Sequence, residues 1–164
     1  MLTNKPSYYA TISIFALVIL YAADRMAKLG FVYTPEIIRS VLSWLPLSEE
    51  VVYNPGIFLG LQIPQTITIF TSTVLLLIVL YYLLKAVQNE HIMSVFGWGL
   101  IFIGGGSNLM DRIIFGVVVD WLIMPWHAVI NLADVYITVG IILLVIYIVL
   151  LQPQNTQKEG RRSS

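Results

Sequence analysis

The stretch on which the predicted fold depends runs from Gly104 to Asp134 and reads GGGSNLMDRIIFGVVVDWLIMPWHAVINLAD. It carries three of the chain's four aspartates, Asp111, Asp120 and Asp134. Long uncharged apolar runs, residues 92–110 and 135–151, lead into it and out of it. A carboxylate at membrane depth costs about 2.5–3.5 kcal/mol even on the most lenient insertion scale. The acids therefore mark a functional centre, and the apolar runs indicate the membrane helices that hold it.

The composition is that of a polytopic membrane protein. The 164 residues are 58% hydrophobic and 11% charged, with a mean hydropathy of +0.84, and they suffice for one domain. Nine basic and nine acidic residues cancel, which argues against a nucleic-acid partner. There is no cysteine, and His91 and His127 are too few and too far apart for a zinc site. We expect neither a metal nor another cofactor.

Four apolar segments predict four transmembrane helices, at about residues 8–29, 66–84, 92–110 and 134–151. The first segment also has the basic start and small terminal residues of a cleavable signal peptide. Helical continuation through Lys28, however, reaches the roughly 20 residues that a bilayer requires. Residues 1–151 are thus expected to form a single all-α membrane domain, followed by a disordered polar tail at 152–164.

The connection at residues 31–65 is predicted to hold the structured part outside the lipid. Apolar residues at helical spacing from Ile37 to Leu45, with Trp44 as an anchor, indicate an interfacial amphipathic helix. Residues 49–58 have the pattern of strand, turn and strand, with the turn at Asn54-Pro55-Gly56, and predict a small extracytoplasmic β-element. The β-branched run Ile113–Trp121 predicts a further strand.

The distribution of basic residues and the glycine content add two further expectations. Basic residues in the free connections favour cytoplasmic termini, which places the acids near the outer face. The glycines of the third segment suit either close helix packing or the close approach of a ligand, and the sequence leaves both interpretations open. These glycines are Gly97, Gly99, Gly104, Gly105 and Gly106. The sequence indicates no oligomeric state.

The polar residues of the central stretch are spaced so that they share helix faces. Asn108, Asp111 and Arg112 stand at i, i+3 and i+4, and we expect Asp111 and Arg112 to form a structural ion pair. Asn131 and Asp134 stand at i and i+3 at the start of the fourth segment. Ser107 has no evident base nearby, and His127 beside Trp126 is predicted to be interfacial.

Asp120 reaches Asp134 from the other side of a connection broken by Pro125. Two carboxylates close together at the edge of an apolar medium share a proton, so that one serves as general base and the other as general acid. This arrangement indicates an aspartic protease. A proton-coupled transporter or channel, with Asp120 and Asp134 as the proton relay, is the alternative from another class.

Five motifs in order carry a resemblance to a known family. They are Asp24-Arg25-Met26-Ala27-Lys28, a weakened Asn54-Pro55-Gly56-Ile57-Phe58, Gly105-Gly106-Ser107-Asn108-Leu109-Met110-Asp111-Arg112, Gly116-Val117-Val118-Val119-Asp120 and Asn131-Leu132-Ala133-Asp134. Over essentially residues 8–151 the chain resembles the bacterial lipoprotein signal peptidases, or signal peptidase II. Three positions depart from the family pattern: Ala27 replaces Thr, Ser107 replaces Gly and Ile130 replaces Phe.

The resemblance implies an aspartic endopeptidase of the bacterial cell membrane. It implies cleavage of prolipoproteins before a diacylglyceryl-modified cysteine, with the β-element cradling a substrate whose acyl chains stay among the membrane lipids. By the same matching, Asp120 and Asp134 are the catalytic pair. The residues implied to line or support the site are Asn54, Asn108, Arg112, Asn131, Asp24 and Lys28.

Overall fold

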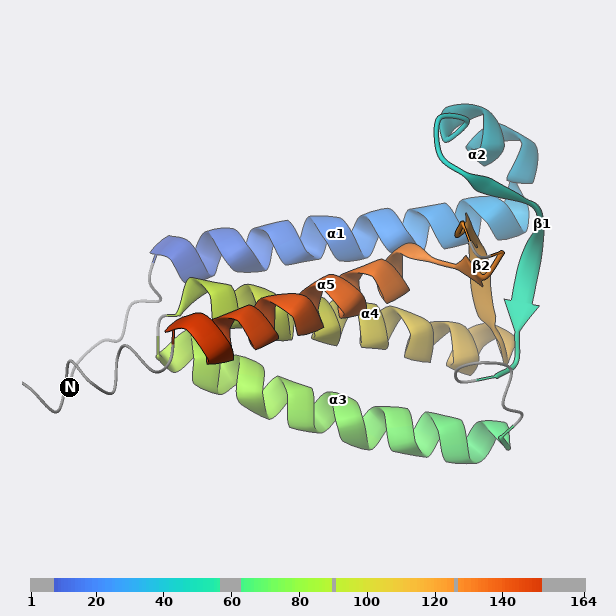
Figure 1. Ribbon diagram of the computed structural model, residues 1–164. Helices are drawn as coiled ribbons and strands as arrows, with labels where there is room; N and C mark the ends of the chain where they lie inside the picture. Colours follow the sequence, from blue (N-terminus) through green and yellow to red (C-terminus); the bar gives the residue numbers. More distant parts are fainter. Residues whose placement is uncertain (1–7, 57–62, 90, 126, 152–164) are drawn as a thin grey trace, which may run out of the picture.

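The computed structural model describes residues 8–56, 63–89, 91–125 and 127–151. Within these residues four long helices lie side by side: α1 (Tyr8–Tyr33), α3 (Gln65–Gln88), α4 (Ile92–Phe115) and α5 (Leu132–Ile146), which a π-helix, Tyr147–Leu151, extends (Figure 1). The short helix α2 (Pro35–Val41) and the strands β1 (Leu47–Asn54), β2 (Val118–Ile123) and β3 (Val129–Ile130) gather at one end of them. The fold is thus mostly helical with a small sheet, as predicted.

Among the described residues, three helical segments are long and apolar enough to cross a membrane. They are Gln65–Gln88, Ile92–Phe115 and Leu132–Leu150, so the structure supports three of the four expected spans. Helix α1 has the length of a span, but its second half carries Asp24, Arg25 and Lys28, and its crossing of the membrane stays a prediction. Helix α5 begins at Leu132, before the predicted start of the fourth span, and α4 ends at Phe115, beyond the predicted end of the third span at Met110.

The end of α4 corrects one expectation. Residues Ile113–Phe115 were predicted to begin a strand, but they complete the last turn of the helix. Gly116 ends it in the left-handed region, at a φ of 77°, and its N–H donates to the carbonyl of Arg112 at 3.2 Å. Glycine adopts this conformation without the steric penalty of a Cβ atom, so it overrides the β-branched pattern before it.

Helix α4 is the centre of the bundle and contacts α1, α3 and α5. A Cβ atom on Gly104 would lie 2.5 Å from the carbonyl oxygen of Ala133, and one on Gly140 would lie 2.7 Å from that of Gly97. These glycines therefore let the backbones of α4 and α5 approach closely, as small residues do between membrane helices. For Gly97 and Gly104 the packing interpretation is confirmed.

The sheet joins parts of the chain that are far apart in the sequence. Its order is β1–β2–β3 with antiparallel pairs, and Val52 of β1 lies opposite Asp120 of β2. The strand predicted to begin at Glu49 is confirmed as part of β1, and its partner β2 comes from beyond α4, where it overlaps the run predicted as a further strand. The second strand expected from Ile57 falls on residues outside those described, as does the polar tail.

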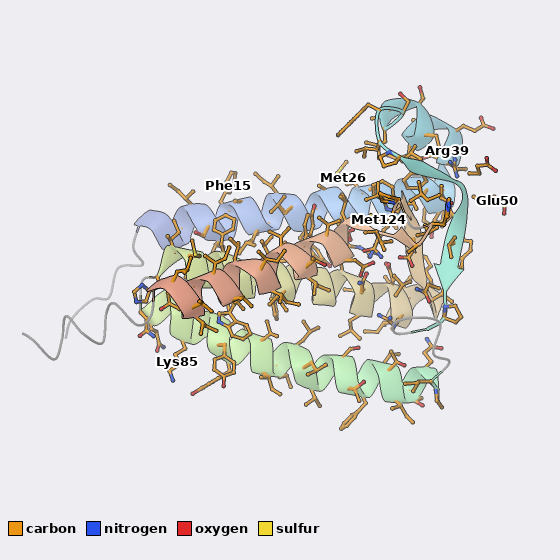
Figure 2. All side chains as sticks on the ribbon, viewed as in Figure 1. Phe15, Met26, Arg39, Glu50, Lys85 and Met124 are labelled. Carbon is orange, nitrogen blue, oxygen red and sulfur yellow. The ribbon has the colours of Figure 1, made fainter. Side chains whose placement is uncertain are left out.

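An aromatic cluster holds α2 and the sheet against the end of α1. The rings of Phe31 and Trp121 stack with their centroids 4.8 Å apart, and the Arg39 guanidinium lies over Phe31 at 5.6 Å. Arg39 also donates to the carbonyl of Ser48 at 2.5 Å. Figure 2 places Arg39 and Glu50 at the opposite end of the helices from Lys85. The cluster thereby positions Asp120, which precedes Trp121 on β2.

Helix α2 has apolar side chains on two sides. Ile38 packs against the aromatic cluster, whereas Ile37 and Val41, together with Trp44 beyond the helix, are exposed to 66%, 62% and 76%. An exposed apolar face of this kind suits a membrane surface. Its location at the interface stays a prediction.

We predict that Gly104→Ala lowers the melting temperature of the protein in detergent. The added Cβ atom would meet the backbone of the first turn of α5, and such overpacking costs about 1–3 kcal/mol. Gly106→Ala is the matched control, because a Cβ atom there has no described neighbour within 4 Å and alanine favours the helix by about 0.5–1 kcal/mol. Equal melting temperatures for the two variants would contradict the packing role of Gly104.

Candidate active site

Asp120 and Asp134 meet where β2 and the first turn of α5 come together. Asp120 is 2% exposed. Its Oδ1 accepts a hydrogen bond from the side-chain amide of Asn131 at 2.6 Å, and its Oδ2 accepts one from that of Asn54 at 3.1 Å. Both oxygens of this carboxyl are therefore held by amide groups from different elements.

Asn131 connects the two acids. It is the N-cap of α5, and its Oδ1 accepts from the N–H of Asp134 at 3.1 Å while its own N–H donates to Asp134 Oδ2 at 3.3 Å. This reciprocal pair is a capping box, in which the cap and the third helical residue satisfy each other's N–H groups. Because the same Asn131 side chain donates to Asp120, one fully buried residue fixes both carboxyls.

A second amide, Asn108, orients Asp134 from α4. Its Nδ2 donates to Asp134 Oδ1 at 2.8 Å, and its Oδ1 accepts from Asn131 at 3.2 Å and from the Lys28 ammonium at 2.8 Å. An ammonium group can only donate, so Lys28 determines that the carbonyl of Asn108 faces it and that the amide NH₂ faces Asp134. The sequence-predicted residues Lys28, Asn54, Asn108 and Asn131 are thus brought together around the two acids.

The surroundings of Asp120 favour its protonated form. The pKa of Asp120 is raised from 3.8 to about 6, chiefly by burial and also by the charge of Asp134. The hydrogen bonds from Asn54 and Asn131 and the charge of Lys28 partly oppose this effect. Near neutral pH such a carboxyl can both hold and release a proton, which general acid–base chemistry requires.

The expected ion pair between Asp111 and Arg112 is not the one that forms. Asp111 pairs with Arg25 and, at 2.9 Å, with Lys28, both on α1. The Arg112 guanidinium instead donates to the carbonyls of Gly56 at 3.1 Å and Asn108 at 3.3 Å. The prediction was wrong because adjacent residues of a helix do not face each other. Arg112 therefore holds the turn that follows Asn54, which donates to Asp120.

Ser107 and Arg25 were missed as parts of the site region. The Ser107 hydroxyl donates to Asp24 and accepts from Arg25 at 3.2 Å, so the expectation that no base lies near Ser107 was wrong. Ser107 is 1% exposed and Asp24 is fully buried, which makes this a structural contact. A sequence signal was present, since Ser107 departs from the family glycine and Arg25 lies inside a charged motif.

The arrangement suits proton transfer between carboxyls and a bound water or peptide. Both acids accept hydrogen bonds from amide groups, and among the described residues no group of three His, Cys, Asp or Glu side chains could hold a metal ion. Paired acids of this kind can activate a water molecule and protonate a leaving group.

Comparisons with known proteins identify a family and a shared fold. The model of the family described as Signal peptidase (SPase) II matches residues 15–150. A lipoprotein signal peptidase of Rickettsia akari is 33% identical over 142 residues, covering 79% of this chain and 70% of the relative. One of Streptococcus pneumoniae is 32% identical over 133 residues, covering 78% and 86%. A solved structure titled as a bacterial membrane enzyme shares the fold, with a TM-score of 0.70, 24% identity, and coverage of 84% and 87%.

We predict that Asp120 makes the stability of the protein depend on pH. Because its folded-state pKa lies above 3.8, its contribution is fully present below pH 3.8 and is lost as the pH rises through about 6. The loss amounts to about 3 kcal/mol. The unfolding free energy of Asp120→Asn, measured against wild type, should therefore increase between pH 4 and pH 7. A difference that does not vary with pH would show that Asp120 titrates at an ordinary value.

Proposed function

Because the chain belongs to the signal peptidase II family, we propose that it removes signal peptides from prolipoproteins with Asp120 and Asp134 as an aspartic catalytic pair. The observation that carries the assignment of these residues is the double role of Asn131. Its side-chain amide donates to Asp120 while its backbone N–H donates to Asp134, so the two acids are held as a unit.

The proposed reaction uses one proton shared by the pair. The ionised carboxyl takes a proton from a water molecule whose oxygen attacks the carbonyl carbon of the scissile peptide. The protonated carboxyl then gives its proton to the departing amine as the carbon–nitrogen bond breaks. Because the two groups titrate as a coupled pair, the macroscopic pKa values belong to both acids together.

The substrate that fits this site is a prolipoprotein cleaved before its diacylglyceryl-modified cysteine. The acyl chains stay among lipids beside the apolar helices, while the peptide bond reaches the acids at the end of the bundle where the sheet lies. We place this end near the outer face of a bacterial cell membrane, with the termini in the cytoplasm. The position of Lys85 at the opposite end is consistent with that orientation (Figure 2).

The alternative of a proton-coupled transporter has no support. The family is one of peptidases, and Asp120 lies on strand β2 beyond the end of α4. A relay through the membrane needs acids along the helices that face a pore. Asp134, in the first turn of α5, also stands at the end of a span.

We predict that Asp120→Asn and Asp134→Asn each lower kcat by about 100-fold or more, since each removes one partner of the shared proton. The measurement is cleavage of a synthetic diacylglyceryl prolipopeptide by purified protein in detergent. Glu36→Gln on α2 is the control, because it neutralises an exposed acid away from the pair. Turnover near the wild-type rate in either Asn variant would refute the assignment.

We also predict that chelators leave the cleavage rate unchanged, as do reagents that modify thiols. The chain has no cysteine, and the described residues contain no metal-binding group. The assay is the same prolipopeptide cleavage after treatment with a strong chelator. Inactivation that added zinc reverses would contradict an aspartic mechanism.

A further inference from the structure

Two buried acids outside the catalytic pair, Asp24 and Asp111, each accept a hydrogen bond from a backbone N–H. In each case the donor is the residue that directly precedes a catalytic aspartate. Asp24 Oδ1 accepts from the N–H of Ala133 at 2.9 Å, and Asp111 Oδ2 accepts from the N–H of Val119 at 3.3 Å. Asp24 and Asp111 are both 0% exposed. Ala133 precedes Asp134 and Val119 precedes Asp120, so the two contacts fix equivalent points on the two segments that carry the acids.

Lys28 joins these two contacts. Its ammonium lies 3.3 Å from Asp24 Oδ2 and 2.9 Å from Asp111 Oδ2, and its side chain is completely buried. We call Asp24, Lys28 and Asp111 the buried triad. The two acids and Lys28, with Arg25 on Asp111, form a set of two positive and two negative charges with no net charge.

Fold stability alone gives little reason for this set of charges. Replacing a buried ion pair by apolar residues is often neutral or stabilising, because desolvation offsets the attraction between the charges. What apolar residues could not supply is an acceptor for the two N–H groups. The N–H of Ala133 lies in the first turn of α5, where no carbonyl of the helix can reach it.

We propose that the buried triad sets the separation and orientation of Asp120 and Asp134, with Asp24 and Asp111 as positioning residues that act through backbone N–H groups. The inference rests on the proposed function of this site. α1 and α4 provide the triad, whereas β2 and α5 provide the catalytic pair. Lys28 makes the two anchors one unit, so a displacement at either anchor moves one acid relative to the other.

The position of the acids governs how readily they share a proton, and a shift of about 1 Å at a reacting group can lower a rate by about 100-fold. Within the described residues no hydrogen bond or ion pair joins the triad directly to the carboxyls of the pair, and Lys28 acts on Asp120 only through its charge. Disturbing it should therefore lower kcat while leaving KM nearly constant. It should also move the pH profile, because the charge of Asp134 contributes to the raised pKa of Asp120.

The test compares two double variants with the same charges, Arg25→Gln with Asp111→Asn and Arg25→Gln with Asp111→Leu. Both leave Asp24 and Lys28 as a neutral pair, but only Asn keeps an oxygen that can accept from Val119. We expect the Leu variant to have a kcat at least tenfold below that of the Asn variant, with KM values within threefold and a displaced pH profile. Equal kcat values and equal pH profiles in two folded variants would overturn the proposal.

If the Leu variant does not fold, the single variant Asp111→Glu tests the positioning role of Asp111. Asp111→Glu keeps the charge but moves the acceptor outward by one methylene, and we expect its kcat to fall about tenfold or more at an unchanged KM. Wild-type kcat in Asp111→Glu would overturn the proposal.

Hydrogen exchange separates failure of this inference from failure of the proposed function. The amides of Val119 and Ala133 should exchange slowly in the wild-type protein, and Val119 should exchange faster in the Leu variant than in the Asn variant. This measurement needs no turnover. Absence of cleavage by the wild type would thus refute the function alone, whereas equal exchange of Val119 in the two variants would refute the positioning role.

Discussion

The structure depends on pairing polar groups that the membrane helices exclude from water. An unpaired charge in such surroundings costs several kcal/mol, so each buried carboxyl, ammonium or amide needs partners. Lys28 is the clearest case, because its ammonium is completely buried and contacts two carboxylates and the carbonyl of Asn108. Within the described residues, only the indole N–H of Trp121 among buried side-chain polar atoms has no hydrogen-bond partner.

This pairing constrains the positions of four segments at once. α1 presents Asp24 and Lys28, α4 presents Asn108 and Asp111, and the segments that carry the proposed catalytic pair are held through them. Such a network leaves few alternative arrangements, because displacing one member leaves another without a partner. The glycines of α4 and α5 allow the required approach, since a larger residue at Gly104 would separate the first turn of α5 from α4.

Outside the helices, a different interaction holds the sheet. Phe31, Trp121 and the residues packed against them attach α2 and β1 to the end of α1 by apolar contacts. The hydrogen bond from Asn54 to Asp120 links this outer part to the proposed catalytic pair. The site therefore lies between an apolar cluster on one side and a charged network on the other, both built on α1.

The mostly helical membrane class and the polar residues that gather at the candidate site could both be predicted from the sequence. Apolar runs of bilayer length and acids placed at their ends are local features, and the shared helix face of Asn131 and Asp134 follows from their spacing of three. Which of these polar groups and strands pair with one another depends on the tertiary structure. Asp111 pairs with Arg25 and Lys28 of α1 and not with Arg112, the Ser107 hydroxyl donates to Asp24, and β1 pairs with β2. These contacts join residues 60 or more positions apart, and their choice depends on how the helices pack, which local periodicity does not encode.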